Sequence, residues 1–549
     1  MKPEIGTCPV EFAAASVRLA LAQSCGKCTP CRTGLDRILT MLERILADEG
    51  TADDLTLLKE TAQAVFDSAD CAIGFEAARG VLESMECFAA DYAAHAAAKG
   101  CTVRPEPVPC RAGCPAQVNV PGYVALVGAG RCADAVRVIR EKNPFPGVCG
   151  LVCEHPCEAV CRRRTVDDAI NIRALKRYAV EHAGDVPAPQ CAPGCGKSAA
   201  VVGGGPAGLT AAYYLALAGW SVTVFEQREK LGGMLRYGIP AYRLPDADLD
   251  RDIDVILSTG ITVKTGVAVG TDVSLDDLRA RFDAVYLSIG AHGAKGLGLE
   301  GEDAQGVVSA VKLLREPAAF DFTDKAVVVI GGGNVAMDAT RTARRLGAKS
   351  VTCIYRRRMV DMPALPDEIA GAQAEGCEIL QLAAPVRIAT AAGRVTGLVV
   401  KPQVAGAIRK GRPTPVDAQV PEETVPADII IVAIGQSVDA KGLDLTPSAT
   451  VLVGGDCATG PATVIRAIAA GREAAEKLSG SVFKETVEIP PPSALSRLKF
   501  GRVNLRERTA AARQNDFKLM ELPMTDEEAT LECSRCLRCD RCGLGALRG

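Results

Sequence analysis

The sequence contains few aromatic residues, few histidines and no long apolar run. Phe, Trp and Tyr make up 4% of its 549 residues, and only four residues are histidine. No apolar stretch approaches the roughly 18 to 20 residues that a membrane-spanning helix requires. The sequence also starts without the basic residues and the apolar core of a signal peptide. These absences predict a cytoplasmic protein that does not insert into a membrane.

An excess of charge of one sign is also lacking. Lys and Arg number 63 against 66 Asp and Glu, which gives a formal net charge of -3. Binding to a nucleic acid or to an anionic membrane surface would favour a basic excess, so we expect neither as the main partner. At roughly 150 residues per domain, the length predicts three or four domains with separate cores.

Two segments combine strands with glycine-rich turns. Residues 199–227 have the pattern of an apolar strand, a glycine turn, a helix and a second strand. Gly203, Gly205 and Gly208 form G-x-G-x-x-G with Pro206 and Ala207, and Glu226 ends the second strand. A glycine fingerprint alone can be an ordinary tight turn. The strand, the helix and the terminal acid, which is placed to accept hydrogen bonds from a ribose, together predict dinucleotide binding.

Residues 325–358 repeat this plan, with Gly331, Gly333 and Ala336 in the turn. Here the second strand ends in Tyr355 and then Arg356, Arg357 and Arg358 instead of an acid. Arginines at this place can pair with a 2'-phosphate, which favours NADP over NAD, although a solvated basic turn is the alternative. The two units predict an α/β protein with two doubly wound domains that bind two different dinucleotides.

The 23 cysteines are the most unusual feature of the composition, and 15 of them fall into three groups. The first group is Cys25, Cys28, Cys31 and Cys71; the second is Cys101, Cys110, Cys114, Cys149, Cys153, Cys157 and Cys161; the third is Cys533, Cys536, Cys539 and Cys542. A C-x-x-C-x-x-C loop suits an iron-sulfur cluster. Zinc is the alternative, but zinc sites normally use two separate pairs, and histidine is scarce. We expect the other eight cysteines to be mostly buried small side chains.

Longer motifs carry a resemblance to a known family. PCRAGCPAQVNVPGY, NPFPGVCGLVCEHPCEAVC, VVGGGPAGLTAA, LGGMLRYGIPAYRLP, VVVIGGGNVAMDATRTA and GGDCATGPATVIRAIAAGREAA occur in that order. Residues from about 107 to 475 thereby resemble the small, NADPH-oxidising subunit of bacterial glutamate synthase and its relatives. The resemblance implies disulfide-reductase-like dinucleotide domains that hold FAD and NADPH, with NADH as an alternative to NADPH.

The same resemblance implies the residues that hold these cofactors. FAD would contact Gly203, Gly205, Pro206, Ala207, Gly208, Glu226, Gly232, Gly233, Gly455 and Asp456, with Gly238, Gly290 and Gly435 as further cofactor-binding candidates. NADPH would contact Gly331, Gly333, Asn334, Ala336, Arg356 and Arg357. No catalytic side chain is expected, because hydride transfer needs stacking and exclusion of water rather than a general base.

The first hundred residues resemble a different protein. SCGKCTPCRTG and the later DCAIG are similar to the C-terminal helical domain of the NADH-binding flavoprotein subunit of respiratory complex I. The resemblance implies that Cys25, Cys28, Cys31 and Cys71 hold one 4Fe-4S cluster. The FMN-binding portion of that subunit has no counterpart here.

The middle and tail cysteines depart from the glutamate synthase pattern. The family has a C-x-x-C pair ahead of the PC-x-x-x-CP segment, where this chain has only Cys101. Cys536 and Cys539 could replace that pair and complete a cluster with Cys110 and Cys161, or the tail could hold a cluster of its own. Relatives supply Gln or Glu where this chain has Lys176, so the fourth ligand beside Cys114, Cys153 and Cys157 stays open. The expected number of clusters is three or four.

The two resemblances together imply an organisation and a function. We expect a helical 4Fe-4S domain at 1–98, a helical iron-sulfur domain at 99–195, an FAD-binding domain at 196–320 and 436–485, an NAD(P)H-binding domain at 321–435, and a linker with a cysteine-rich tail at 486–549. Hydride would pass from NADPH to FAD, and single electrons would pass through the clusters to a partner. That partner would be a large iron-sulfur, molybdopterin-containing formate dehydrogenase-like or hydrogenase-type subunit, with ferredoxin as another candidate.

Two alternatives compete with this function. The chain could be the subunit of an electron-bifurcating ferredoxin:NADP transhydrogenase. It could also be a redox-sensing or scaffold protein that holds its cofactors without turnover.

Overall fold

The computed structural model describes residues 8–47, 49–97, 108–409, 411–440, 442–490 and 501–540. Cys101 and Cys542, both predicted cluster ligands, lie outside these ranges. In the described ranges no helix is both long and apolar enough to cross a membrane.

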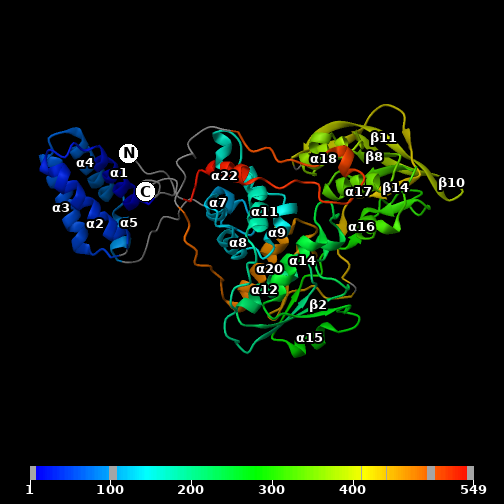
Figure 1. The fold of residues 1–549 in the computed structure, drawn as a ribbon, viewed down its shortest axis with the longest axis horizontal. Coiled ribbons are helices and arrows are strands. Elements are labelled where there is room, and N and C mark those ends of the chain that lie inside the picture. Colours follow the sequence, from blue (N-terminus) through cyan, green and yellow to red (C-terminus); the bar gives the residue numbers. More distant parts are fainter. Residues whose placement is uncertain are drawn as a thin grey trace.

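The first part is a bundle of helices that forms a separate body in Figure 1. It contains α1 (Pro9–Gln23), a π-helical turn (Pro30–Leu35), α2 (Asp36–Leu46), α3 (Ala52–Ser68), α4 (Ala72–Cys87) and α5 (Ala89–Ala96). A capping box between Thr51 and Asp54 starts α3. Leu35, Ile38 and Leu42 are fully buried in the bundle's own core. The helical character expected for the first domain is confirmed.

The second part is a set of short helices that carries the middle cysteines. They are α6 (Pro109–Ala112), α7 (Val120–Gly128), α8 (Cys132–Arg140), α9 (Pro146–Val152), α10 (Pro156–Ala159), a 3-10 turn (Arg162–Thr165) and α11 (Ile172–His182). The Asn119 side chain caps α7 by accepting a hydrogen bond from the Gly122 amide. Four of the middle cysteines, Leu175 of α11 and Leu209 of the next domain belong to one continuous core.

The first doubly wound domain has a parallel sheet of five strands in the order β16-β4-β1-β2-β3. Its elements are β1 (Ser198–Val202), α12 (Pro206–Leu217), β2 (Ser221–Glu226), α13 (Met234–Tyr237), α14 (Asp246–Leu257), β3 (Thr262–Thr265), α15 (Leu275–Arg281), β4 (Ala284–Leu287), β16 (Val451–Val453), α19 (Asp456–Thr459) and α20 (Val464–Ser479). The central strands are almost wholly buried, as expected for a parallel sheet covered on both faces. Because β16 pairs with β4, the chain returns to this sheet after the second domain.

The second doubly wound domain has a parallel sheet in the order β6-β14-β7-β8-β9. Its elements are β6 (Val307–Ser309), α16 (Ala310–Arg315), a 3-10 turn (Pro317–Ala319), β7 (Ala326–Ile330), α17 (Asn334–Arg345), β8 (Ser350–Tyr355), a 3-10 turn (Met359–Asp361), α18 (Pro366–Ala374), β9 (Glu378–Gln381) and β14 (Ile429–Val432). We expected this domain to begin at residue 321, but β6 already belongs to its sheet. A three-residue edge strand is too short to show a periodic pattern, and only its parallel pairing with β14 assigns it.

An antiparallel layer extends from the second domain. β10 (Ala383–Ala391) pairs with β11 (Arg394–Arg409), which also pairs with β12 (Arg412–Asp417) and β13 (Glu423–Pro426). The chain passes between the two doubly wound domains twice. The two connecting segments pair with each other through the short antiparallel strands β5 (Gly293–Ala294) and β15 (Gln436–Ser437).

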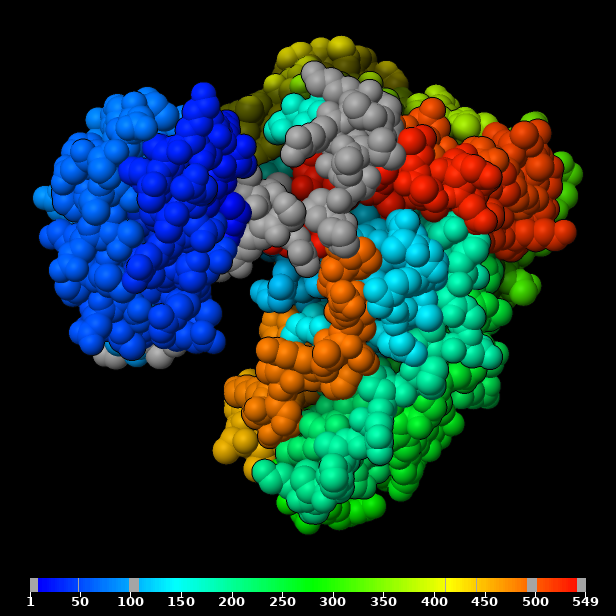
Figure 2. Space-filling model, turned by 60° about the vertical axis from the view of Figure 1, so that its left-hand side comes forward, coloured from blue at the N-terminus to red at the C-terminus, as the bar shows by residue number. Residues whose placement is uncertain are grey.

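The C-terminal segment, residues 501–540, crosses from the second dinucleotide domain to the middle helices. It contains α21 (Ala510–Arg513) and α22 (Asp526–Ser534). Arg173 of α11 forms an ion pair with Glu521, and Arg345 of α17 donates to the carbonyl of Asp516 at 3.0 Å. Figure 2 shows this red segment against the cyan surface of the middle helices. The segment therefore ties together two parts of the chain that are far apart in sequence.

Candidate functional site

The first glycine turn opens onto a cavity of about 390 Å³ between the carboxyl ends of the first sheet's strands. Gly203 has φ +107°, and a Cβ there would lie 2.5 Å from the carbonyl oxygen of Ser288. A Cβ at Gly208 would overlap the carbonyl oxygen of Gly203. The turn thus requires glycine at both positions, and α12 begins directly at the cavity. An elongated space at this turn suits the pyrophosphate of a dinucleotide.

Eight of the residues predicted to hold FAD line this cavity. They are Gly203, Gly205, Pro206, Ala207, Glu226, Gly233, Gly290 and Asp456. Gly208, Gly232, Gly238, Gly435 and Gly455 are outside the lining, although Gly208 shapes it from behind.

Glu226 is held rigidly at the end of β2. Its side chain is 6% exposed, and its two carboxylate oxygens accept hydrogen bonds from the amides of Gly204 and Arg228, both at 2.8 Å. An ionised carboxylate can accept about four hydrogen bonds, so both oxygens retain capacity for the hydroxyls of a ribose.

The cavity is also lined by basic side chains that are not among the predicted cofactor-binding residues. Arg228 and Arg315 line it, and Arg228 lies 3.4 Å from Nδ1 of His292. Burial, with added repulsion from the two arginines, lowers the pKa of His292 to about 4, so the imidazole is neutral at pH 7. Fixed guanidinium groups beside a neutral ring favour a phosphate-bearing ligand. In the sequence, the position of Arg228 two residues after Glu226 could have indicated that it lies at the cavity.

Asp456, the first residue of α19, also lines the cavity. Its carboxylate accepts a hydrogen bond from the Ala462 amide at 3.2 Å. Burial raises the pKa of Asp456 above its usual value. The group is thus a half-buried acceptor at the place where the resemblance to the glutamate synthase family put a flavin contact.

The second glycine turn has the same construction. A Cβ at Gly331 would overlap the carbonyl oxygen of Ala433, and Ala336 is fully buried against the turn. Asn334 starts α17, but its side chain is engaged with protein groups. Its amide nitrogen donates to Glu154 at 2.7 Å, and its oxygen accepts from the Leu365 amide at 3.0 Å. Asn334 therefore links this turn to the loop that carries Cys153.

The three arginines after β8 differ in their environments. Arg358 forms a bidentate ion pair with Asp361, with distances of 2.8 and 2.9 Å. Arg357 is half-buried and donates to the carbonyl of Pro413 at 2.9 Å. Arg356 is exposed. Arg356 is thus the side chain best placed to turn toward a phosphate at the end of β8.

The four cysteines of the first group differ in exposure. Cys25 and Cys71 are exposed, Cys28 is half-buried and Cys31 is buried. Burial, followed by the neighbouring Cys28, raises the pKa of the Cys31 thiol to about 11, and the charge of Cys71 adds to this effect. Hydrogen bonds from backbone amides at Cys31 and Asp70 lower the pKa of Cys28. The loop of the C-x-x-C-x-x-C motif and the start of α4 thus bring the distant Cys71 to the other thiols.

Four middle cysteines surround the side chain of Lys176 in the interior. Cys114, Cys149, Cys153 and Cys157 are all at most 7% exposed, and Lys176 is 6% exposed. A hydrogen bond from the Cys149 thiol lowers the pKa of Cys153 to about 6 despite burial. Burial disfavours the charge of Lys176, but the negative charge of the four cysteines in their thiolate form outweighs burial and raises the pKa of the ammonium.

The remaining middle cysteines meet the tail. Cys110, Cys161, Cys536 and Cys539 line one small cavity of about 20 Å³. Burial and the nearby charges of Cys536 and Cys161 raise the pKa of Cys110 to about 12. Cys533 is not part of this lining, and its Cβ packs on Gly128 of α7.

Arginines fix the tail in this position. Arg163 donates to the carbonyl of Arg535 at 3.0 Å, and Arg535 forms ion pairs with Glu532 and Asp167. Arg163, Arg535 and Glu532 are all buried. In the part of the chain that the structure describes, no three His, Cys, Asp or Glu side chains converge closely enough to hold a single metal ion.

The other cysteines are mostly structural. Cys132, Cys353, Cys377 and Cys457 are buried, Cys8 and Cys191 are half-buried, and Cys87 and Cys195 are exposed. Burial raises the pKa of Cys353 and Cys377 to about 12, which keeps both as neutral thiols.

Comparisons with known proteins agree with this arrangement. Three family models match: the NADH-ubiquinone oxidoreductase-F iron-sulfur binding region at residues 11–95, dihydropyrimidine dehydrogenase domain II with a 4Fe-4S cluster at 79–186, and pyridine nucleotide-disulphide oxidoreductase at 197–471. Iron-sulfur domains followed by disulfide-reductase-like dinucleotide domains, as expected from the sequence, are thereby confirmed.

Whole-length relatives are also found. The chain is 33% identical to the beta subunit of the NADP(+)-dependent formate dehydrogenase of Moorella thermoacetica, over 96% of this chain and 90% of the relative. It is 33% identical to the beta subunit of an NADPH-Fe(3+) oxidoreductase of Geobacter sulfurreducens, with the same coverage of both chains. The glutamate synthase [NADPH] small chain of Escherichia coli is 33% identical over 67% of this chain and 87% of the relative. The chain therefore belongs to the family of flavin- and iron-sulfur-type, NADPH-linked oxidoreductase subunits that contains these proteins.

Proposed function

We propose that the chain is the nucleotide-oxidising electron-transfer subunit of a larger complex, taking electrons from NADPH, or returning them to NADP, by way of FAD and 4Fe-4S clusters. The observation that carries the proposal is the continuous core shared by the middle cysteines and α12, the helix that starts at the dinucleotide cavity. Asp252 of α14 strengthens this contact by accepting a hydrogen bond from the Val148 amide at 2.9 Å, beside Cys149.

The chain's own residues would bind, orient and shield the cofactors. The turn from Gly203 to Gly208 would accommodate a pyrophosphate, Glu226 would accept hydrogen bonds from a ribose, and Arg228 with Arg315 would offset phosphate charge. A flavin exchanges electrons both in pairs and singly, and that is the chemistry FAD would supply here. The middle helices pack on α12 and α14 in one continuous core, which would limit the access of water between the cavity and the thiols.

Three groups of thiols would hold three clusters. We propose the bundle site of Cys25, Cys28, Cys31 and Cys71, a site of Cys110, Cys161, Cys536 and Cys539, and a site that includes Cys114, Cys153 and Cys157. The common cavity of the second set supports a cluster shared between the middle domain and the tail over one held by the tail alone. Apart from the early start of the second sheet, we propose the domain boundaries that we predicted from the sequence.

The bundle is the proposed exit to a partner. Cys25 and Cys71 are exposed, so a cluster there would lie near the surface and within reach of a second protein. The relatives named as beta subunits belong to a formate dehydrogenase and an Fe(3+) oxidoreductase. We propose a large formate dehydrogenase-like or hydrogenase-type subunit as the partner.

Anaerobic reduction of the purified holoprotein tests the function. We expect NADPH to bleach the flavin absorbance rapidly and then to produce the electron paramagnetic resonance signals of reduced clusters. A protein that stays yellow after NADPH addition would contradict the proposal and support the scaffold alternative. Ferredoxin reduction that occurs only with a second acceptor present would instead support the bifurcating alternative.

The arginines after β8 allow a test of nucleotide preference. Replacing both Arg356 and Arg357 with alanine should weaken NADPH binding by about tenfold or more, since a charge-assisted hydrogen bond contributes roughly 1.5 to 3 kcal/mol. NADH binding should change little, as measured by the nucleotide concentration that half-bleaches the flavin. The matched control is Arg358→Ala, because Arg358 is already paired with Asp361. Equal losses for both nucleotides would contradict recognition of the 2'-phosphate.

A further inference from the structure

Lys176 is a buried cation in unusual surroundings. It lies on α11 with 6% of its surface exposed, and among the described residues it forms no ion pair with a carboxylate. The groups that act on its charge are the thiols of Cys149, Cys153, Cys114 and Cys157. A buried ammonium is strongly destabilising unless negative charge lies close to it. Four neutral thiols would not supply that charge, whereas four thiolates on an iron-sulfur cluster would.

Cys149 is placed to be one of these thiolates. It is fully buried, and it belongs to the same core as Cys114, Cys153 and Cys157. The contact between α9 and α11 fixes its position, because a Cβ at Gly150 would lie 2.8 Å from the Cα of Arg177. Cys149 precedes Gly150, and Lys176 precedes Arg177. The close approach of Gly150 to Arg177 therefore brings Cys149 and Lys176 into the same interior region.

We propose that Cys149 completes a four-thiolate site with Cys114, Cys153 and Cys157, and that the Lys176 ammonium is its buried counter-cation and raises the cluster's reduction potential. The inference rests on the proposed function, because it assumes a cluster in the middle domain. Lys176 is not itself a ligand in this arrangement, since a protonated ammonium has three donors and no lone pair. Reduction adds a negative charge to the cluster, and a fixed cation in a poorly screened interior stabilises that form.

Two substitutions of Lys176 separate charge from shape. The holoprotein is poised at the potential at which the wild-type cluster is half reduced, and the ratio of reduced to oxidised cluster is read by electron paramagnetic resonance. Lys176→Met should lower that ratio at least tenfold, which corresponds to about 59 mV for one electron. Lys176→Arg, which retains the charge, should stay within about threefold of the wild type. An unchanged ratio in Lys176→Met, or equal shifts in both variants, would overturn the role of the cation.

Cys149→Ala tests the fourth ligand. The variant should lose the signal of one cluster, and its iron and acid-labile sulfide should fall by one cluster's content. Cys132→Ala is the matched control, because Cys132 is buried in the same core, and it should retain the full content. Full iron, sulfide and signal in Cys149→Ala would overturn the assignment.

The design also distinguishes this inference from the proposed function. Bound flavin that NADPH still bleaches shows that a variant has folded, and Cys149→Ser provides a second variant should the alanine protein lose its flavin. A wild-type protein without any iron-sulfur signal would contradict the proposed function itself. If the wild type contains clusters, but substitution of Cys149 leaves the cluster content unchanged and substitution of Lys176 leaves the ratio of reduced to oxidised cluster unchanged, only the inference drawn here would be contradicted.

Discussion

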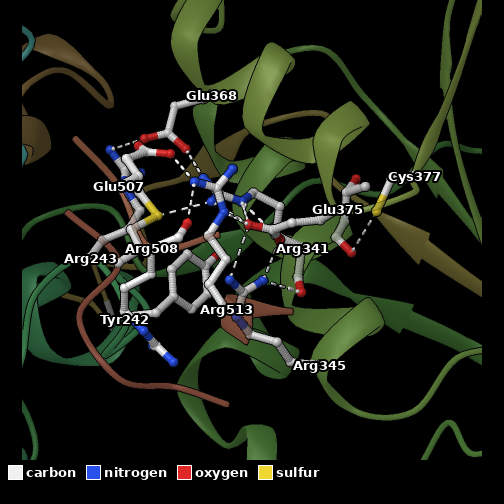
Figure 3. A network of polar contacts seen from close by, with 12 residues as sticks. Tyr242, Arg243, Arg341, Arg345, Glu368, Glu375, Cys377, Glu507, Arg508 and Arg513 are labelled. Atoms are coloured by element: carbon white, nitrogen blue, oxygen red, sulfur yellow. Dashed lines mark hydrogen bonds and ion pairs between the residues drawn. The ribbon is translucent and has the colours of Figure 1, made fainter. Parts of the chain in front are cut away.

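Replacing Glu375 with glutamine should destabilise the second dinucleotide domain by about 3 to 5 kcal/mol, the usual cost of breaking a buried ion pair by removing one partner. Glu375 is completely buried where α18 ends. Its Oε1 accepts from Arg341 at 2.6 Å and from Arg513 at 2.9 Å, and its Oε2 accepts from Arg345 at 2.6 Å. Figure 3 shows the three guanidinium groups converging on this carboxylate.

The size of this effect follows from the local charge balance. Burial opposes ionisation, but the hydrogen bonds from Arg341 and Arg345 hold the pKa of Glu375 below its usual value. A neutral amide at position 375 would leave Arg345 without its buried counter-charge. It would also weaken the contact that Arg341 and Arg513 each make with this side chain. Because Arg513 belongs to the C-terminal segment, that segment should also detach more readily.

The measurement is denaturant unfolding followed by circular dichroism, with limited proteolysis of the C-terminal segment as a second readout. Glu378→Gln is the matched control, since Glu378 is exposed at the start of β9 and should change the unfolding free energy by under about 0.5 kcal/mol. Equal stability of the two variants would show that the network carries little of the domain's stability.

Cys536→Ala should remove an entire cluster although the substitution lies in the C-terminal tail. Cys536 faces the same cavity as Cys110 and Cys161 and is half-buried there. A cluster deprived of one of four thiolate ligands is incomplete, so the iron and sulfide content should fall by one cluster. NADPH should still bleach the flavin, because the dinucleotide cavity is formed by other elements. Electron delivery to an external one-electron acceptor should fall sharply.

Two further substitutions decide between a shared site and a tail site. Cys110→Ala should reproduce the loss seen in Cys536→Ala, while Cys533→Ala should retain the cluster because its side chain packs on α7 outside the cavity. The opposite pattern, with loss in Cys533→Ala and full content in Cys110→Ala, would show that the tail holds a cluster by itself.

Local patterns in the sequence predicted much of the fold. Both strand, turn and helix units have the expected form, and the turn at Gly203 is constrained as its glycine spacing predicted. Such features depend on neighbours a few residues apart, which is why spacing reveals them. The edge strand β6 was missed because its three residues are defined only by pairing with β14, more than a hundred residues later.

The candidate site was harder to predict where it depends on distant contacts. A contact of Asn334 with NADPH stays a prediction, and the contacts of its side chain with Glu154 and Leu365 are additional to it; no sequence spacing connects these residues. The network around Glu375 joins α17, α18 and the tail in the same way. Within the sequence, the spacing of Arg341 and Arg345 at i and i+4 indicates only that both lie on one face of a helix.

The shared cavity of Cys110 and Cys536 also imposes an order on biosynthesis. These residues are separated by 426 positions, 536 minus 110, and both dinucleotide domains lie between them. While the ribosome is still translating the intervening chain, Cys110 and Cys161 have no tail thiols beside them. At the proposed shared site, insertion of iron and sulfide would therefore have to follow translation of Cys536 and Cys539, and a chain terminated before them would not transmit electrons through this site.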